Sequence, residues 1–366
     1  MGSGEAAKSR RRSSKPQSQS PLNVTMMAVA AEAGVSRATV SRVFHGTTPV
    51  APSTRDAVHA AAERLGYIPN EMARSLAASS SDIIGLLLRG PSNPAYGLLF
   101  SELQAEISRL GLQMITVAPS PTEGANFERQ ALNRLLGLRV GGMFVSTGVI
   151  RTEMLEPFLD VVPVVIIGRP ENHPRIYSVS YDENGNATLL ADAVAAQGHR
   201  DVAVVIPSAE LSVAENLRGR VMARRLKQHG VTVHRIPSPT FGVVEEGIAE
   251  VMALYDAGTI TAAMFPTDLR LLAFLSHARA VGVRTPEDLS VTGCDGVLPG
   301  VELLGITTVR IPVERAAVRA ATVMQSMLAE PDRVKIEHEL LPGTLLPGRT
   351  LGPPRRGTRT AAGLTR

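Results

Sequence analysis

The chain of 366 residues lacks the features of exported and membrane-bound proteins. Its single cysteine, Cys294, excludes an intrachain disulfide and suits a reducing cytosol. No apolar run approaches the roughly 20 residues that span a membrane. The arginines near the N-terminus are not followed by the apolar segment of a secretory signal. We therefore expect a cytoplasmic protein with no membrane partner.

The sequence also lacks the common signatures of cofactor-dependent and metal-dependent enzymes. It contains no phosphate loop, no His-Glu-x-x-His motif and no paired cysteines, and Gly141-Gly142 lacks the spacing of a dinucleotide fingerprint. His199 and Cys294 fit structural roles better than catalytic ones, so we expect no enzyme, no cofactor and no metal. Tryptophan is absent and aromatic residues make up 4% of the chain, which leaves little of the stacking platform typical of sugar sites.

The net charge of +4 conceals an uneven distribution. Residues 1–80 carry ten Lys and Arg against five Asp and Glu, residues 81–351 carry 24 against 29, and residues 352–366 carry four against none. Basic character at the two ends suggests an anionic polymer as the partner of the N-terminal part. Residues 1–22 have almost nothing to bury and are expected to form a disordered basic tail, whose Arg10-Arg11-Arg12 run either contacts that polymer or is simply solvated.

Residues 34–43 read as a tight turn that leads into a short helix. Gly34 can adopt the left-handed conformation that ends one helix, and the Ser36 hydroxyl can cap the next one. Within this second helix, Val40 and Val43 share one face, which leaves small and cationic side chains on the others. The pattern is typical of a helix-turn-helix motif.

Helices are predicted at 25–33, 36–45 and 53–66, which makes a compact three-helix unit. Pro69 then interrupts the pattern, because proline disfavours helix in the residue before it. Residues 71–78 are good helix formers, but about eight residues are marginal alone in water and need a partner to fold. The serines at 79–81 follow as a flexible joint.

This region resembles the DNA-binding head of the lactose-repressor (LacI/GalR) family of bacterial transcriptional regulators. The resemblance runs over roughly sixty positions and rests on Val24-Thr25, Val29-Ala30, Ala33-Gly34-Val35-Ser36, Thr39-Val40-Ser41-Arg42-Val43, Val50, Thr54-Arg55 and Leu65-Gly66-Tyr67-Ile68-Pro69-Asn70.

The resemblance implies that the second helix enters the major groove, that residues 70–81 form a hinge helix and linker, and that a hinge leucine wedges into the minor groove. By position, Arg37 and Ala38 resemble the base-reading pair, Arg42 a base- or phosphate-contacting arginine, and Leu76 the wedge. Without the resemblance, Leu76 reads equally well as a packing residue of a linker helix, and Arg37 as a solvated charge. The predicted DNA-binding residues are Thr25, Ser36, Arg37, Ala38, Thr39, Ser41, Arg42, Asn70, Ala73 and Leu76.

From residue 82 onward, short apolar runs alternate with amphipathic helical stretches. This alternation predicts parallel sheets covered by helices, most simply two doubly wound lobes with ligands near the carboxyl ends of the strands. Strands are predicted at 83–88, 113–117, 142–145, 162–167, 202–206, 231–236, 262–265 and 289–292. Helices are predicted at 97–110, 126–136, 185–197, 216–228, 268–281 and 312–328.

The region from residue 82 onward also resembles the same family and its periplasmic sugar-binding relatives. The markers are Asn93-Pro94-Ala95-Tyr96, the apolar strand with Pro163, the run Asp182, Gly185 and Gly198-His199-Arg200, the stretch 285–291 with Asp295, and Thr307-Thr308-Val309. Arg218 and Asp268 match an arginine and an aspartate that face each other across the family's effector cleft, although Val221 and Met222 depart from the pattern nearby. The predicted effector-binding residues are Asn93, Tyr96, Arg218, Asp268 and Phe241.

Each cleft residue also has a plainer interpretation: Asp268 as a helix cap, Arg218 as a surface charge and Tyr96 as core. The predicted organisation is a tail (1–22), a helix-turn-helix domain (23–69), a hinge (70–81), a two-lobed periplasmic-binding-protein-like domain (82–351) and a basic disordered tail (352–366). No heptads follow the last helix, so a homodimer is the economical expectation.

The resemblance implies a ligand-responsive repressor of the bacterial nucleoid. It would bind a pseudo-palindromic double-stranded DNA operator and be controlled by a small, sugar-like effector, as inducer or as co-repressor. A free binding protein would have no use for residues 23–78. A nucleotide-dependent enzyme would need motifs that are missing.

Overall fold

The computed structural model describes residues 24–45, 49–69, 81–90, 92–119, 125–148, 150–240 and 245–355. The chain forms two compact units, residues 1–79 and 80–366. The division falls within the predicted hinge, which, apart from Ser81, lies outside the described residues.

The first unit contains three helices, α1 (Met26–Glu32), α2 (Arg37–His45) and α3 (Pro52–Leu65). Thr25 caps α1 through its hydroxyl, which accepts a hydrogen bond from the Ala28 amide at 3.3 Å. The first and third helices end at glycines in the left-handed region, Gly34 (φ 65°) just past α1 and Gly66 (φ 66°) at the cap of α3. The third helix begins at Pro52, one residue earlier than predicted, because proline suits the first turn of a helix.

A small apolar core holds this unit together. Val29 and Ala30 of α1, Val40 of α2 and Val58 of α3 are buried against one another. The predicted inward face of α2 is therefore confirmed, and its remaining faces stay free of the core.

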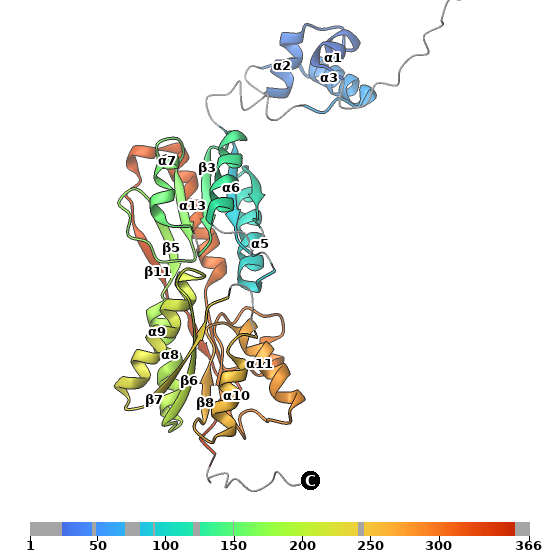
Figure 1. Ribbon diagram of the computed structural model, residues 1–366. Helices are drawn as coiled ribbons and strands as arrows, with labels where there is room; N and C mark the ends of the chain where they lie inside the picture. The colour runs from blue at the N-terminus through green and yellow to red at the C-terminus, as the bar shows by residue number, and fades with distance from the viewer. Residues whose placement is uncertain are drawn as a thin grey trace, which may run out of the picture. The chain divides into compact units, whose positions relative to one another are not determined.

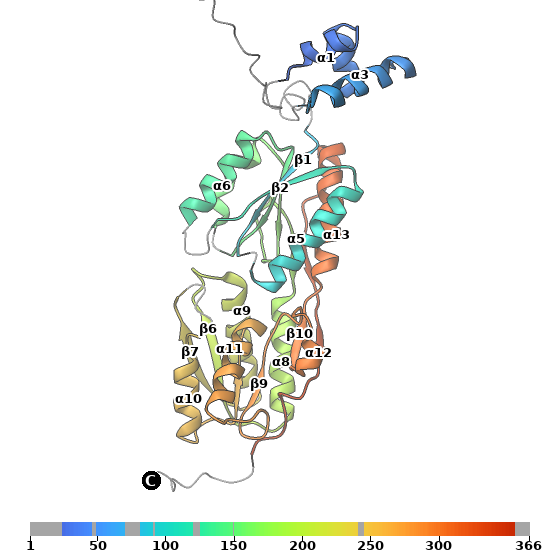
Figure 2. The ribbon, with the colours of Figure 1, turned by 90° about the vertical axis from the view of Figure 1, so that its right-hand side faces the viewer.

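The second unit begins with a six-stranded parallel sheet in the order β11-β5-β4-β3-β1-β2. Helices α5 (Pro94–Arg109) and α13 (Val313–Ala329) cover one face of it, and α6 (Ala125–Gly137) covers the other (Figure 2). The short α7 (Glu156–Leu159) packs on the same face as α6. We call this sheet with its helices the N-lobe. Its strands are β1 (Ile83–Leu88), β2 (Gln113–Val117), β3 (Gly142–Ser146), β4 (Val164–Ile167), β5 (Tyr177–Tyr181) and β11 (His338–Leu341).

A four-stranded parallel sheet in the order β7-β6-β8-β9 forms the C-lobe. Helices α8 (Glu183–Ala196) and α9 (Val213–Gln228) pack on one face, and α10 (Ile248–Asp256) and α11 (Asp268–Ala280) on the other (Figure 1). The strands are β6 (Asp201–Pro207), β7 (Thr232–Ser238), β8 (Ala262–Met264) and β9 (Ser290–Thr292), beside a two-stranded antiparallel pair, β10 (Thr308–Arg310) and β12 (Thr344–Leu346). The remaining short helices are η2 (Thr152–Met154), α12 (Val301–Leu304) and η3 (Pro331–Arg333).

The chain passes between the lobes three times, after β5, after β10 and after β11. Hydrogen bonds tie these crossings together: the Asp182 amide donates to the Leu341 carbonyl at 2.9 Å, and the Gly343 amide donates to Asn186 Oδ1 at 2.9 Å. The second crossing is joined to the third where Arg310 of β10 pairs with Thr344 of β12, and the Ile311 amide donates to the Asp295 carbonyl of the C-lobe at 3.0 Å. The crossings thus form one bonded hinge region rather than three independent linkers.

All eight predicted strands are present, but β5, β10, β11, β12 and helix α10 were missed. Strand β5 reads Tyr-Ser-Val-Ser-Tyr, and its buried hydroxyl residues weaken the apolar signal on which the prediction depended. The missed strands β10, β11 and β12 have three or four residues each and lie next to the interlobe crossings.

The predicted tail from residue 352 begins too early. His199 Nε2 bonds the Gly352 carbonyl at 2.9 Å and Arg355 pairs with Asp288 at 3.2 Å, so the lobe continues to at least residue 355.

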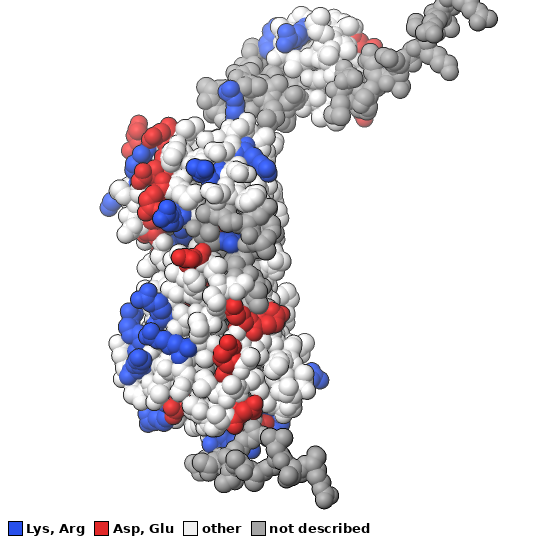
Figure 3. Space-filling model, in the orientation of Figure 1, with Lys and Arg blue, Asp and Glu red and all other residues white. Residues whose placement is uncertain are grey.

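Among the described residues, no helix is both long enough and apolar enough to cross a membrane. On the face shown in Figure 3, basic side chains gather over α9, which exposes Arg220, Arg224 and Lys227. Arg218 of the same helix is buried, at 3% exposure, so it belongs to a different environment from its basic neighbours.

Candidate functional site

The exposed face of α2 carries the predicted base-reading residues. The Ser36 hydroxyl accepts a hydrogen bond from the Thr39 amide at 3.1 Å and lies 2.9 Å from the Thr39 hydroxyl, which fixes the start of the helix. Arg37 and Ala38 follow directly and are exposed. Arg42 is exposed one turn later, and its Nε donates to the Ala38 carbonyl at 3.3 Å.

This geometry suits the reading of a nucleic-acid groove. A guanidinium at the first turn of an exposed helix can reach base edges or phosphates, and a small neighbour lets the helix approach closely. Thr25 is exposed, and Thr39 and Ser41 are half-buried beside the same face. The predicted hinge residues Asn70, Ala73 and Leu76 lie outside the described residues.

The second unit contains a cavity lined by both lobes and by the crossings between them. It encloses about 490 Å³ including its open mouth. The lining residues are Asn93, Ala95, Tyr96, Leu99, Ser146, Gly168, Tyr181, Glu183, Ser212, Ala214, Glu215, Arg218, Thr267, Asp295 and Ile311.

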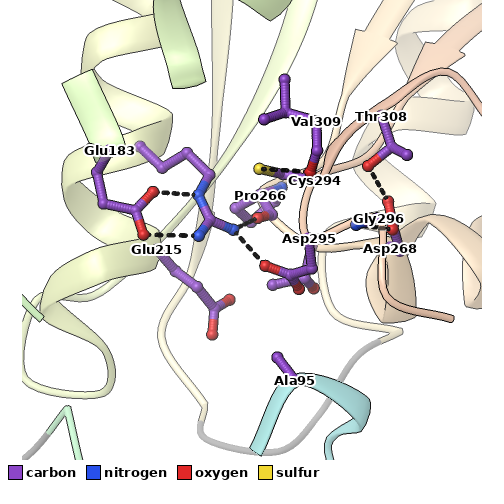
Figure 4. Close-up of polar contacts among 12 residues, drawn as sticks. Ala95, Glu183, Glu215, Pro266, Asp268, Cys294, Asp295, Gly296, Thr308 and Val309 are labelled. Carbon is purple, nitrogen blue, oxygen red and sulfur yellow. Dashed lines mark hydrogen bonds and ion pairs between the residues drawn. The ribbon is translucent and has the colours of Figure 1, made fainter. Parts of the chain in front are cut away.

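Arg218 forms the centre of a buried ion-pair network in this cavity. Its Nε and Nη2 donate to the two carboxylate oxygens of Glu183 at 2.7 and 2.8 Å. Its Nη1 donates to Asp295 Oδ1 at 3.0 Å and to the Pro266 carbonyl (Figure 4). The plainer interpretation of Arg218 as a surface charge is therefore wrong.

The network also reaches the hinge region. Glu183 begins α8 directly after the first crossing, and the Asp295 carbonyl accepts a hydrogen bond from Ile311 in the second. Through Glu183 and Asp295, Arg218 is thereby linked to two of the three crossings. Any ligand that contacts Arg218 therefore lies beside the hinge region.

Asp268 occupies a different place from the one predicted. Its carboxylate accepts hydrogen bonds from the Thr308 hydroxyl and the Gly296 amide, both at 2.7 Å, and it is 1% exposed. The neighbouring Thr267, not Asp268, caps α11 and lines the cavity. Burial raises the pKa of Asp268 to about 6, and the two hydrogen bonds only partly offset it. The structure thus places Asp268 behind the cavity wall, where it holds the loop that carries Asp295.

Asn93, Tyr96 and Arg218 are the predicted effector residues that the structure brings together. The Asn93 side chain caps α5 by accepting from the Ala95 amide at 2.9 Å. Tyr96 lies on the first turn of that helix, and burial, with Glu215 as a further cause, raises its pKa to about 12. The remaining predicted residue, Phe241, lies outside the described residues.

Several lining residues were not predicted as site residues. Glu183 and Glu215 lie on the first turns of α8 and α9, where acidic residues commonly favour helix starts, so nothing in the sequence marked them as cavity residues. Asp295 was noted only as a family marker. Its φ of 115° is unusual for a residue other than glycine and turns the backbone at the cavity wall.

The fold and the two sites together define a class of protein: a helix-turn-helix head joined to a two-lobed, ligand-binding α/β unit. The model of the bacterial regulatory proteins of the lacI family matches residues 25–70, and that of the periplasmic binding protein-like domain matches residues 191–351.

Individual relatives agree. Catabolite control protein A of Priestia megaterium is 31% identical over 278 residues, which cover 75% of this chain and 83% of the relative. The chain therefore belongs to the lacI family and is a ligand-responsive, DNA-binding transcriptional regulator.

Two solved structures share the arrangement. The lac repressor dimer bound to operator and an anti-inducer has a TM-score of 0.78 and 23% identity, and the match covers 90% of this chain and 99% of that one. The complex of the transcriptional regulator CelR with cellobiose has a TM-score of 0.63 and 27% identity, with 90% and 100% covered. The expected fold class is confirmed by these matches.

Proposed function

We propose that the chain acts as a cytoplasmic repressor that binds a pseudo-palindromic operator as a homodimer. The observation that carries the proposal is that one chain combines an exposed, capped recognition helix with an open-mouthed cavity between two lobes, at a hydrogen-bonded hinge. The lac repressor relative binds an operator as a dimer, and two-fold symmetry would present two copies of α2 to successive major grooves.

On the DNA side, Arg37 is the residue we assign to base reading, with Ala38 beside it. A bidentate arginine contact to guanine discriminates against a wrong base by about 1–3 kcal/mol. Thr25, Ser36, Thr39 and Ser41 are assigned to phosphates, and Arg42 to a base or a phosphate. In the hinge, Asn70, Ala73 and Leu76 are assigned to the minor groove, where an apolar wedge would kink the site.

On the ligand side, the cavity between the lobes is assigned to a small polar effector. CelR, which is similar over most of its length, binds cellobiose, and this supports a sugar or a related polar metabolite. A ligand that favours one arrangement of the lobes shifts the equilibrium by its difference in affinity for the two arrangements, so both induction and co-repression fit. We assign no catalytic step and no cofactor to the protein.

The test is a gel-shift or anisotropy titration of the full chain against genomic fragments at physiological salt. We expect a site bound at least about a thousandfold more tightly than random DNA. Arg37→Ala should reduce this ratio by about tenfold or more, whereas Arg64→Ala, an exposed arginine on α3 paired with Glu32, should leave it nearly unchanged. Equal affinity for all fragments would refute the proposed function.

A further inference from the structure

We propose that the effector bears a protonated amine, so that it is an aminated sugar or a similarly hydroxylated amine. This inference rests on the proposed function, because it takes the interlobe cavity as the effector site. It goes further by fixing the charge of the ligand from the charges of the cavity wall.

Carboxylates outnumber guanidiniums around the cavity. Among the described lining residues, Glu183, Glu215 and Asp295 are acidic and Arg218 alone is basic. Behind the lining, the described arginines of the N-lobe are matched by carboxylates: Arg89 faces Glu128 at 3.7 Å and Arg169 faces Glu171 at 3.5 Å. In the C-lobe, Arg270 pairs with the lining residue Glu215 at 3.2 Å, so carboxylates still outnumber guanidiniums by one among these residues. A phosphate or carboxylate ligand would be repelled by this negatively charged wall.

The one basic lining residue has little left to offer an anion. A guanidinium has five N–H donors, and the contacts with Glu183, Asp295 and Pro266 use four of the five in Arg218. Most N–H donors of Arg218 are therefore used in contacts within the cavity wall, and few are left to bind a negatively charged ligand.

Two of the lining carboxylates each use only one of their two oxygens in a described ion pair. Glu215 pairs with Arg270 of α11 through Oε2 at 3.2 Å, and within the part of the chain that the structure describes its Oε1 makes no hydrogen bond to a protein group. Asp295 accepts from Arg218 through Oδ1, and the same holds there for its Oδ2. Figure 4 shows Glu215 and Asp295 on the side of the network toward Ala95, which belongs to the opposite lobe. An ammonium group between these two side chains would receive charge-assisted hydrogen bonds.

The raised pKa of Asp295 is consistent with an excess of negative charge around it. Burial raises its pKa well above the ordinary value, and Arg218 lowers it only in part, because Asp268 and Glu183 lie nearby. A bound cation would compensate the carboxylate that the protein itself leaves partly uncompensated.

A second polar feature points into the same cavity. The Ser146 side chain lines the cavity and is fully buried, and its hydroxyl has no hydrogen-bond partner among the described residues. A buried hydroxyl without a partner is costly, so a ligand group that bonds it is favoured. Tyr96 and Tyr181 add aromatic rings to the lining, and such rings attract cations. Together these groups fit a ligand with an amine and at least one hydroxyl.

The test compares ligands that differ only in charge. The full chain is titrated calorimetrically with glucosamine, glucose and glucose 6-phosphate, with the corresponding galactose series, and with putrescine against 1,4-butanediol. We expect an aminated member to bind at least about tenfold more tightly than its neutral partner, as one charge-assisted hydrogen bond implies, and the phosphorylated member to bind more weakly still.

Glu215→Gln should reduce that preference to within about twofold, because it removes the charge but keeps the shape. The control is Asp192→Asn. Asp192 of α8 pairs with Arg225 of α9, the helix that also carries Glu215, and both side chains are partly exposed. This variant should keep the preference for the aminated ligand. If Glu215→Gln fails to fold, the comparison of matched ligands on the unaltered chain still decides the matter.

Three results would overturn the inference: a neutral member that binds as tightly as its amine, a phosphorylated member that binds more tightly, or no binding by any aminated member. A neutral sugar that binds and alters operator affinity would sink the inference but leave the proposed function intact. If the chain bound an amine but showed no specific DNA binding, the proposed function would be refuted and the inference about the ligand would stand.

Discussion

Removal of the Arg218 guanidinium is expected to destabilise the two-lobed unit strongly. In Arg218→Met, a side chain of similar length keeps the packing but leaves the Glu183 carboxylate, whose side chain is 0% exposed, and Asp295 without their cation. Breaking a buried pair in this way costs about 3–5 kcal/mol.

The structure offers a matched control on the same helix. Arg225 also makes a two-pronged contact, with Asp192 at 2.6 and 3.0 Å, but the two side chains are 36% and 39% exposed. An exposed pair of this kind contributes about 0–1 kcal/mol, so Arg225→Met should have little effect on stability.

Urea unfolding of the full chain, followed by circular dichroism at pH 7, measures the difference. With a denaturant slope of about 3 kcal/mol/M, Arg218→Met should lower the midpoint by about 1–1.7 M, and Arg225→Met by at most about 0.3 M. Equal shifts for the two variants would refute the reasoning that Arg218 holds the hinge. A double variant, Arg218→Met with Glu183→Gln, should recover part of the loss.

Three further outcomes follow from individual contacts. Ser36→Ala should speed hydrogen exchange of the first α2 amides by about fivefold, because loss of an N-cap costs about 1 kcal/mol; unchanged exchange would exclude the cap. Gly293→Ala should cost about 1–3 kcal/mol in thermal unfolding, because a Cβ there would overlap Asp268 Oδ1, whereas Gly137→Ala, with open space around it, should be neutral; similar effects would contradict the packing. Burial lowers the pKa of His199, so as pH falls below about 6.5 the imidazole is protonated in the unfolded chain before it is protonated in the folded one. The free energy of unfolding should therefore fall by at most about 1.4 kcal/mol per pH unit on account of His199. Unfolding measured from pH 7 to 5 should show that His199→Gln removes this contribution to the pH dependence.

The recognition helix could be predicted because its signals are local. Gly34 and Ser36 act within one turn of their own positions, and Val40 needs only the helical period to be assigned inward. The alternation of strands and helices likewise predicted both lobes. The last two strands gave no local signal: β11 returns to pair with β5, far earlier in the chain, and β12 pairs only with the three-residue strand β10.

The cavity could be predicted only in part. Tyr96 and Arg218 were placed in it by family resemblance, but the partner of Arg218 is Glu183, 35 residues away, and a single sequence does not reveal such a pair. The role of Asp268 in effector binding stays a prediction, and the residue that lines the cavity is its neighbour Thr267. At the junction between strand and helix, neighbouring side chains point in different directions, so Thr267 reaches the cavity and Asp268 turns to Gly296.

The central claim is that occupancy of the interlobe cavity changes the affinity of the protein for its DNA site. It is tested most directly by titrating the full chain onto its selected operator, at fixed physiological salt, with and without a saturating ligand identified by calorimetry. Linkage predicts a change in operator affinity of about 5-fold to 150-fold, and the same factor in ligand affinity when operator is present. Identical operator affinity with the cavity full and empty would contradict the account.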